Sequence, residues 1–180
     1  MRRAFRRDAR KGFASQVPPI LQEANLAFDK GEFGRAAQLF ERIAEGADAR
    51  GGPRASLFHL QAGRARVLAG QVRLGLPSLK RALSLLAERG ELVRLQRAAS
   101  RCIDELNMRK LTNEAIEIEA WLKDLSPVAF SEYKTQPPLP KRPALPTHCP
   151  HCGASLRPDE VDWLDDVTAE CGYCGSPVRE

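Results

Sequence analysis

The residues best placed to do chemistry are four of the five cysteines, which lie in two pairs near the end of this 180-residue chain. Each pair has the form Cys-x-x-Cys, and the four residues are Cys149, Cys152, Cys171 and Cys174. Two such pairs, with eighteen residues between them, predict one tetrahedral Zn²⁺ site. Because four thiolates fill the tetrahedron, no corner is left for water or substrate. The sequence therefore predicts a structural ion rather than a catalytic one.

The residues around these cysteines, 148–180, form what we call the cysteine module. They are too few to bury a self-sufficient core without a metal. Gly153 and Gly175 each follow a cysteine pair and permit the positive φ that a tight turn around an ion needs. The pattern Cys-Pro-x-Cys-Gly with a partner Cys-x-x-Cys-Gly closely resembles the zinc-ribbon family, which implies a small β module. His148 and His151 are the alternative ligands.

Between the two pairs, the sequence favours a β-hairpin. Val161 and Trp163 alternate with Asp162 as in a short strand, residues 165–166 suit a turn, and residues 167–169 suit a return strand. The alternative is a short helix over residues 159–166, with acidic residues in its first turn.

The module also carries candidate docking residues for a protein partner. The apolar and polar candidates are Pro150, His151, Trp163, Leu164, Tyr173, Pro177 and Arg179. An acidic face surrounds Trp163 and comprises Asp159, Glu160, Asp162, Asp165 and Asp166. Apolar groups ringed by charges are typical of docking surfaces. The alternative role of Trp163 is to fill the small core of the module.

Part of this pattern resembles a RING-type ligase module. The shared features are the Cys149-Pro-x-Cys152 pair, the central Trp163 and a proline, Pro177, after the last cysteine. The resemblance implies docking of a carrier (E2) enzyme in a bacterial-type ubiquitin-like conjugation pathway. Such a ligase acts by proximity and orientation, without a covalent intermediate. A RING holds two zinc ions, whereas this module has ligands for one.

The cysteine module follows a segment whose pattern predicts six helices. Apolar residues recur at helical spacing over residues 18–30, 32–45, 53–69, 72–89, 91–109 and 111–125. We expect Gly31, Gly46 and Gly70 to end the first three, and Pro77 to end or kink the first turn of the fourth. The fold class is therefore mainly α, with antiparallel helical hairpins and a small β module. Cys102 is expected to be a packed thiol rather than a nucleophile.

Small residues recur at matching offsets in the three helical pairs. Ala24, Gly63 and Ala99 start the pattern, and a further small or apolar residue follows twelve positions later in each pair. Over residues 17–125 this resembles the tetratricopeptide-repeat family, which implies stacked hairpins with a concave face that binds protein segments. A plain six-helix bundle is the alternative.

The remaining segments differ in composition. Residues 1–16 form a basic tail with Arg2, Arg3, Arg6, Arg7, Arg10 and Lys11. Residues 126–147 hold six prolines and are expected to act as a stiff spacer between the helices and the cysteine module. Residues 1–147 contain 26 Lys and Arg against 16 Asp and Glu, whereas residues 148–180 contain two against seven. The two parts should therefore attract different partners.

These features favour a protein–protein interaction adaptor, in which the helical array holds one partner and the cysteine module another. The alternative is a nucleic-acid- or ribosome-associated factor that binds through the basic tail. No nucleophile–His–acid set or phosphate loop appears, so a hydrolase is not expected. The chain has no apolar run of about 20 residues and no secretory signal pattern, and paired reduced cysteines fit a reducing compartment. We therefore expect a cytoplasmic protein that does not bind membranes.

Overall fold

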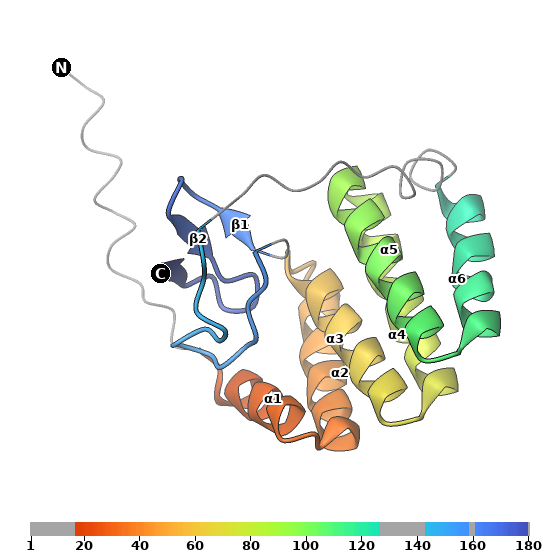
Figure 1. Ribbon diagram of the computed structural model, residues 1–180, viewed down its shortest axis with the longest axis horizontal. Helices are drawn as coiled ribbons and strands as arrows, with labels where there is room; N and C mark the ends of the chain where they lie inside the picture. Colours follow the sequence, from red (N-terminus) through yellow and green to blue (C-terminus); the bar gives the residue numbers. More distant parts are fainter. Residues whose placement is uncertain (1–16, 127–142, 159–160, 180) are drawn as a thin grey trace.

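The computed structural model describes residues 17–126, 143–158 and 161–179, which contain six helices and a small antiparallel sheet (Figure 1). The helices are α1 (Pro19–Asp29), α2 (Phe33–Ala49), α3 (Ala55–Leu68), α4 (Val72–Glu88), α5 (Leu92–Met108) and α6 (Thr112–Leu125). The strands are β1 (Asp162–Trp163), β2 (Thr168–Glu170) and β3 (Pro177–Arg179), in the order β1-β2-β3. The prediction of a mainly helical fold with a small C-terminal sheet is confirmed.

The predicted helix ends are confirmed except in the second helix and at Pro77. Gly31 and Gly70 have φ of 77° and 75° and end α1 and α3 as left-handed caps. The expected stop at Gly46 is wrong, because α2 continues to Ala49 and Gly51, with φ of 63°, makes the turn instead. A glycine inside a helix costs about 1 kcal/mol, and packing of the next turn against the core offsets that cost. Pro77 lies inside α4 without ending it.

Consecutive helices contact one another along the chain from α1 to α6 (Figure 1). α3 and α4 approach each other closely at Gly63 and Gly75. A Cβ on Gly63 would lie 2.9 Å from the carbonyl oxygen of Gly75 and 2.7 Å from the side chain of Leu79. Two of the small residues in the repeating pattern therefore permit this contact.

The buried side chains form two clusters. The first joins α1, α2 and α3 to the cysteine module, and it includes Leu21, Phe40 and Phe58 together with Leu156 and Val178 of the module. The second comprises buried residues of α4, α5 and α6 with Val67 at the end of α3. Each cluster thus belongs to a different half of the helical array.

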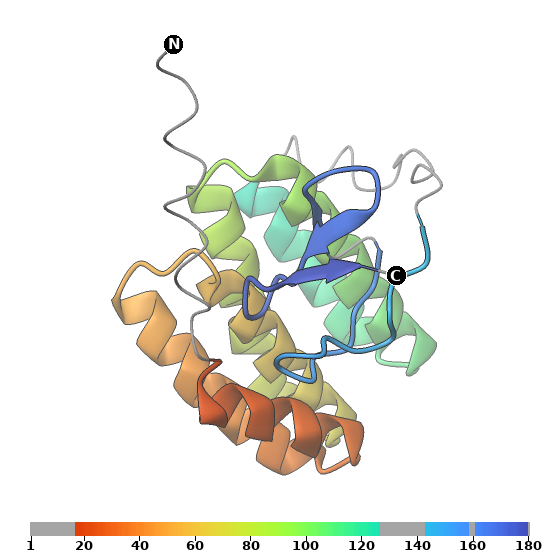
Figure 2. The same cartoon turned by 90° about the vertical axis from the view of Figure 1, so that its left-hand side faces the viewer.

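The cysteine module lies against the helical array rather than apart from it. Figure 2 shows the module (blue) in front of the helices and above α1 (red). This packing corrects the expectation that a stiff linker keeps the two parts separate. Burial of apolar surface drives the contact, because the module alone has too few residues for a core. Residues 127–142 of the expected spacer lie outside the described residues, as does the basic tail.

Candidate metal centre

The sulfur atoms of the four paired cysteines form one cluster. Their Sγ atoms lie within 4.8 Å of one another and all four residues are buried. The Sγ atoms of Cys149 and Cys174 are 3.7 Å apart, and those of Cys152 and Cys171 are 3.8 Å apart. An ion with metal–sulfur bonds of about 2.3 Å places tetrahedral corners about 3.8 Å apart, as for zinc. The four sulfurs could therefore hold one ion, and they leave no corner open.

Two similar turns bring the sulfurs together. The amide of Gly153 donates to the carbonyl oxygen of Cys149 at 2.9 Å, and that of Gly175 donates to the carbonyl oxygen of Cys171 at 2.8 Å. Both glycines have positive φ, 74° and 77°, as the sequence predicts. The hydroxyl of Ser176 lies 3.3 Å from Sγ of Cys174, where it can donate to a thiolate.

The four sulfurs lie close enough together to alter one another's protonation. The pKa of Cys152 is raised well above its ordinary value, chiefly because its thiol lies against the sulfurs of Cys171 and Cys174 and also because it is buried. A divalent cation relieves this crowding by neutralising the thiolates, and its binding releases their protons. The donor set therefore suits an ion that prefers sulfur.

Polar side chains of α1 and α3 anchor the module. Nδ2 of Asn25 donates to the carbonyl oxygen of Cys152 at 2.8 Å in a buried position. Nε2 of Gln22 donates to the carbonyl oxygen of His151 at 3.0 Å, and Nε2 of Gln61 donates to the hydroxyl of Tyr173. Neither Asn25 nor Gln61 was predicted from the sequence. Each is a polar residue next to an alanine on the apolar face of a helix, and this pattern could have indicated a buried hydrogen bond to another part of the chain.

Most of the predicted docking residues are exposed, but they are divided among several elements. Pro150, His151, Leu164, Pro177 and Arg179 are exposed at the surface of the module. The carbonyl of His151 faces α1, whereas β1 lies beside α5. The predicted docking set is therefore spread over the module.

Two aromatic docking candidates have other surroundings. Trp163 is half-buried, and its indole N–H donates to the carbonyl oxygen of Pro158 at 3.0 Å. Tyr173 is buried between the module and α3, so a docking role for its ring is wrong. It stabilises the internal interface instead, because its apolar ring and its hydroxyl both find partners there.

The acidic face is partly used inside the molecule. Asp162 forms an ion pair with Arg94 of α5. Oδ1 of Asp165 accepts hydrogen bonds from the amides of Val167 and Thr168 at 2.8 and 2.6 Å, which lower the pKa of its carboxyl group. Asp165 therefore fixes the turn of the predicted β-hairpin, and Asp166 remains exposed. Asp159 and Glu160 lie outside the described residues.

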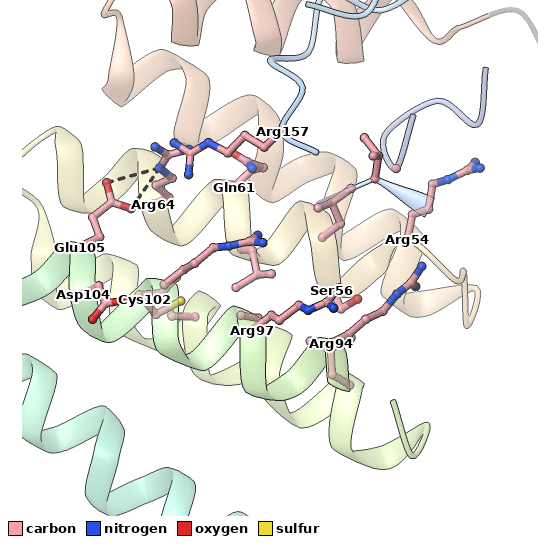
Figure 3. Close-up of a pocket in the computed structure, with 18 of the residues that line it drawn as sticks. Arg54, Ser56, Gln61, Arg64, Arg94, Arg97, Cys102, Asp104, Glu105 and Arg157 are labelled. Atoms are coloured by element: carbon pink, nitrogen blue, oxygen red, sulfur yellow. Dashed lines mark hydrogen bonds and ion pairs between the residues drawn. The ribbon is translucent and has the colours of Figure 1, made fainter. Parts of the chain in front are cut away.

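A groove of about 870 Å³ lies between α3, α5 and the cysteine module (Figure 3). We call it the arginine groove after the seven arginines that line it: Arg54, Arg64, Arg94, Arg97, Arg101, Arg109 and Arg157. Cys102 also lines it, and desolvation raises the pKa of this thiol to about 12. The thiol is therefore protonated at neutral pH, which agrees with the expectation that it is not a nucleophile.

Comparison of the chain with protein-family models, with curated proteins and with solved structures finds no match. Among the described residues, no helix combines the length and the hydrophobicity that a membrane crossing requires.

Proposed function

We propose that the protein is a protein–protein interaction adaptor in which a structural Zn²⁺ ion, held by the four cysteines, shapes a docking loop. The helices serve as a tetratricopeptide-like scaffold for this loop. The ion performs no chemistry, since four sulfurs occupy its tetrahedron. A reducing compartment such as the cytoplasm would keep these thiolates available.

The exposed loop between β1 and β2 carries this proposal. Leu164 and Val167 are 58% and 57% exposed, although the two amide hydrogen bonds to Asp165 pin the loop between them. An apolar side chain held out on an ordered turn gains nothing from the fold itself. Covering it with a partner removes apolar surface from water, and the exposed Asp166 beside it would suit a basic partner.

The most specific form of the proposal is a RING-like ligase that recruits a carrier (E2) enzyme. The exposed Pro150 and Pro177 and the half-buried Trp163 support it as accessible groups of the cysteine module. In this form the protein would orient a thioester-charged carrier for attack by a lysine amine, which releases the carrier's thiol.

The test measures discharge of a thioester-charged carrier enzyme onto free lysine, with the full-length, zinc-loaded protein as the additive. We expect acceleration by the wild-type chain and loss of that acceleration when Leu164→Asp is combined with Val167→Asp. Ile116→Asp is the matched control, because Ile116 on α6 is also 58% exposed.

If the variant with Leu164→Asp and Val167→Asp accelerates discharge as much as the wild-type chain, the docking surface lies elsewhere. If no form of the protein accelerates discharge, the ligase proposal is wrong. If another protein then co-purifies with the chain in a way that depends on Leu164, the adaptor proposal still holds.

A further inference from the structure

The arginine groove has an excess of positive charge that is built into two facing helices. Seven arginines line it against four acidic residues, Asp104, Glu105, Asp162 and Glu170. Three of these acids already pair with arginines of the groove: Glu105 with Arg64 at 3.0 Å, Glu170 with Arg54 at 3.1 Å, and Asp162 with Arg94. The lining therefore has a formal excess of three positive charges, and Figure 3 shows the labelled arginines of α3 and α5 gathered around one space.

The groove is long enough for an extended chain. Its lining on α5 runs from Arg94 to Arg109, a distance of about 22 Å at 1.5 Å per helical residue. An extended peptide covers this distance with about seven residues. Arg94, Arg97 and Arg101 recur at helical spacing on the α5 face that lines it, so positive charges are distributed along the path.

Apolar side chains also line the groove. They include Leu57 and Leu60 of α3, which are only partly buried, and buried side chains such as Leu79 and Leu106. A lining that is both apolar and cationic suits a ligand that carries both leucine-like side chains and carboxylates.

Two observations disfavour a nucleic acid in the same place. None of the described residues that line the groove is aromatic, so no ring is available for base stacking. The four carboxylates in the lining would repel a continuous phosphate backbone, whereas a peptide can place its acids beside arginines only.

The cysteine module forms one wall of the groove. Arg157, Val161 and Gly172 belong to the module and line the space together with α3 and α5. The helices alone therefore do not make this site, and its shape depends on the metal centre that folds the module.

We propose that the arginine groove binds an extended, acidic segment of a partner protein, about seven residues long, with apolar side chains between its carboxylates. This site is separate from the β1–β2 loop, and it forms only when the cysteine module is docked.

The test uses fluorescence anisotropy with a labelled heptapeptide, Glu-Leu-Asp-Glu-Leu-Asp-Glu, and the full-length, zinc-loaded protein. Arg97→Glu combined with Arg101→Glu should weaken binding at least tenfold, because two attractive charges become repulsive. Arg73→Glu combined with Lys123→Glu is the matched control. Both residues are exposed, lie outside the groove and change the net charge equally. This control should change the affinity less than threefold.

Two further measurements examine the wall and the ligand chemistry. Arg157→Glu, on the module, should also weaken binding about tenfold, and Leu164→Asp should leave it unchanged. A heptapeptide with lysine in place of every acidic residue, and one with serine in place of both leucines, should each bind at least tenfold more weakly.

Equal loss in the Arg73 and Lys123 control would overturn the proposal, as would unchanged binding in the Arg97 and Arg101 variant. Tighter binding of a twelve-residue oligothymidylate than of the acidic peptide, if the Arg97 and Arg101 variant loses it, would make the groove a nucleic-acid site. Unchanged peptide binding by Arg157→Glu would show that the cysteine module is not part of the binding site. Because Leu164 is outside the groove, these outcomes are independent of the docking-loop proposal.

Discussion

A single buried amide group ties the cysteine module to the first helix. Nδ2 of Asn25 donates to the carbonyl oxygen of Cys152, and Asn25 is only 4% exposed. Truncating it to Ala leaves that carbonyl without its donor, which costs about 1–3 kcal/mol. We expect Asn25→Ala to lower Tm by about 3–10 °C in thermal denaturation followed by circular dichroism. Gln22→Ala removes an exposed hydrogen bond to the neighbouring His151 and should change Tm little. Equal losses in the two variants would contradict an anchoring role for Asn25.

A second residue-scale feature is the buried His59 beside Asp48, with Nε2 and Oδ2 3.4 Å apart. Burial lowers the pKa of His59, although Asp48 partly offsets this effect, and the hydrogen bond from Arg81 lowers the pKa of Asp48. Below the unfolded His pKa of about 6.5, the unfolded chain binds more protons than the folded one. The free energy of unfolding should therefore fall as the pH drops below about 6.5. The contribution of Asp48 is lost at still lower pH, as the pH falls through its depressed folded pKa.

Urea denaturation of the metal-saturated protein at several pH values from 7.5 to about 5.5 measures this slope. His59→Gln should flatten it, because the glutamine has no proton to gain. A wild-type slope in His59→Gln would assign the acid sensitivity to other groups.

At the scale of elements, the α3–α4 contact depends on the absence of side chains at Gly63 and Gly75. Gly63→Ala places a methyl group against the backbone of Gly75 and the side chain of Leu79, at 2.9 and 2.7 Å. Overpacking of this kind costs about 1–3 kcal/mol. We expect Tm to fall by about 3–10 °C. Gly34→Ala is the control, because Gly34 lies in α2 with nothing within 4 Å of a new Cβ. It should leave Tm unchanged or raise it slightly, since alanine favours helices. A harmless Gly63→Ala would mean that the two helices can separate at little cost.

Most elements were predictable from local signals, and the exceptions have local causes. Gly31 and Gly70 end helices where the apolar period also ends, so two signals agree. At Gly46 the signals disagree, because the next turn of α2 still packs on the core and only its burial decides the helix end. The alternation around Trp163 indicates the observed hairpin. The side chain of Asp165 completes that hairpin by accepting the turn amides.

At the scale of the whole molecule, the cluster of four cysteines was predictable and its surroundings were not. The spacing of the four cysteines is sufficient to predict that they cluster. The anchor from Gln61 to Tyr173 and the ion pair from Arg94 to Asp162 join residues separated by 112 and 68 positions. No local pattern encodes such pairs, because they follow from how the helices and the module pack. The arginine groove was missed for the same reason, although each of its arginines is visible in the sequence.

The division of the core into two clusters predicts an uneven response to metal removal. The first cluster contains the four cysteines together with α1, α2 and α3, whereas the second consists mainly of α4, α5 and α6. After chelation, hydrogen exchange followed by mass spectrometry should speed up most in α1 and α2, at least tenfold. The amides of α5 and α6 should keep most of their protection. A uniform increase along all six helices would show that the clusters unfold as one unit.

The buried bond between Asn25 and Cys152 spans 127 positions of the chain. At synthesis rates of about 5–20 residues per second, α1 is synthesised about 6–25 seconds before its partner carbonyl. During that interval α2 can cover one side of α1, but the side of α1 that packs on the cysteine module stays exposed. A chain truncated before Cys149 would leave that side of α1 exposed to solvent.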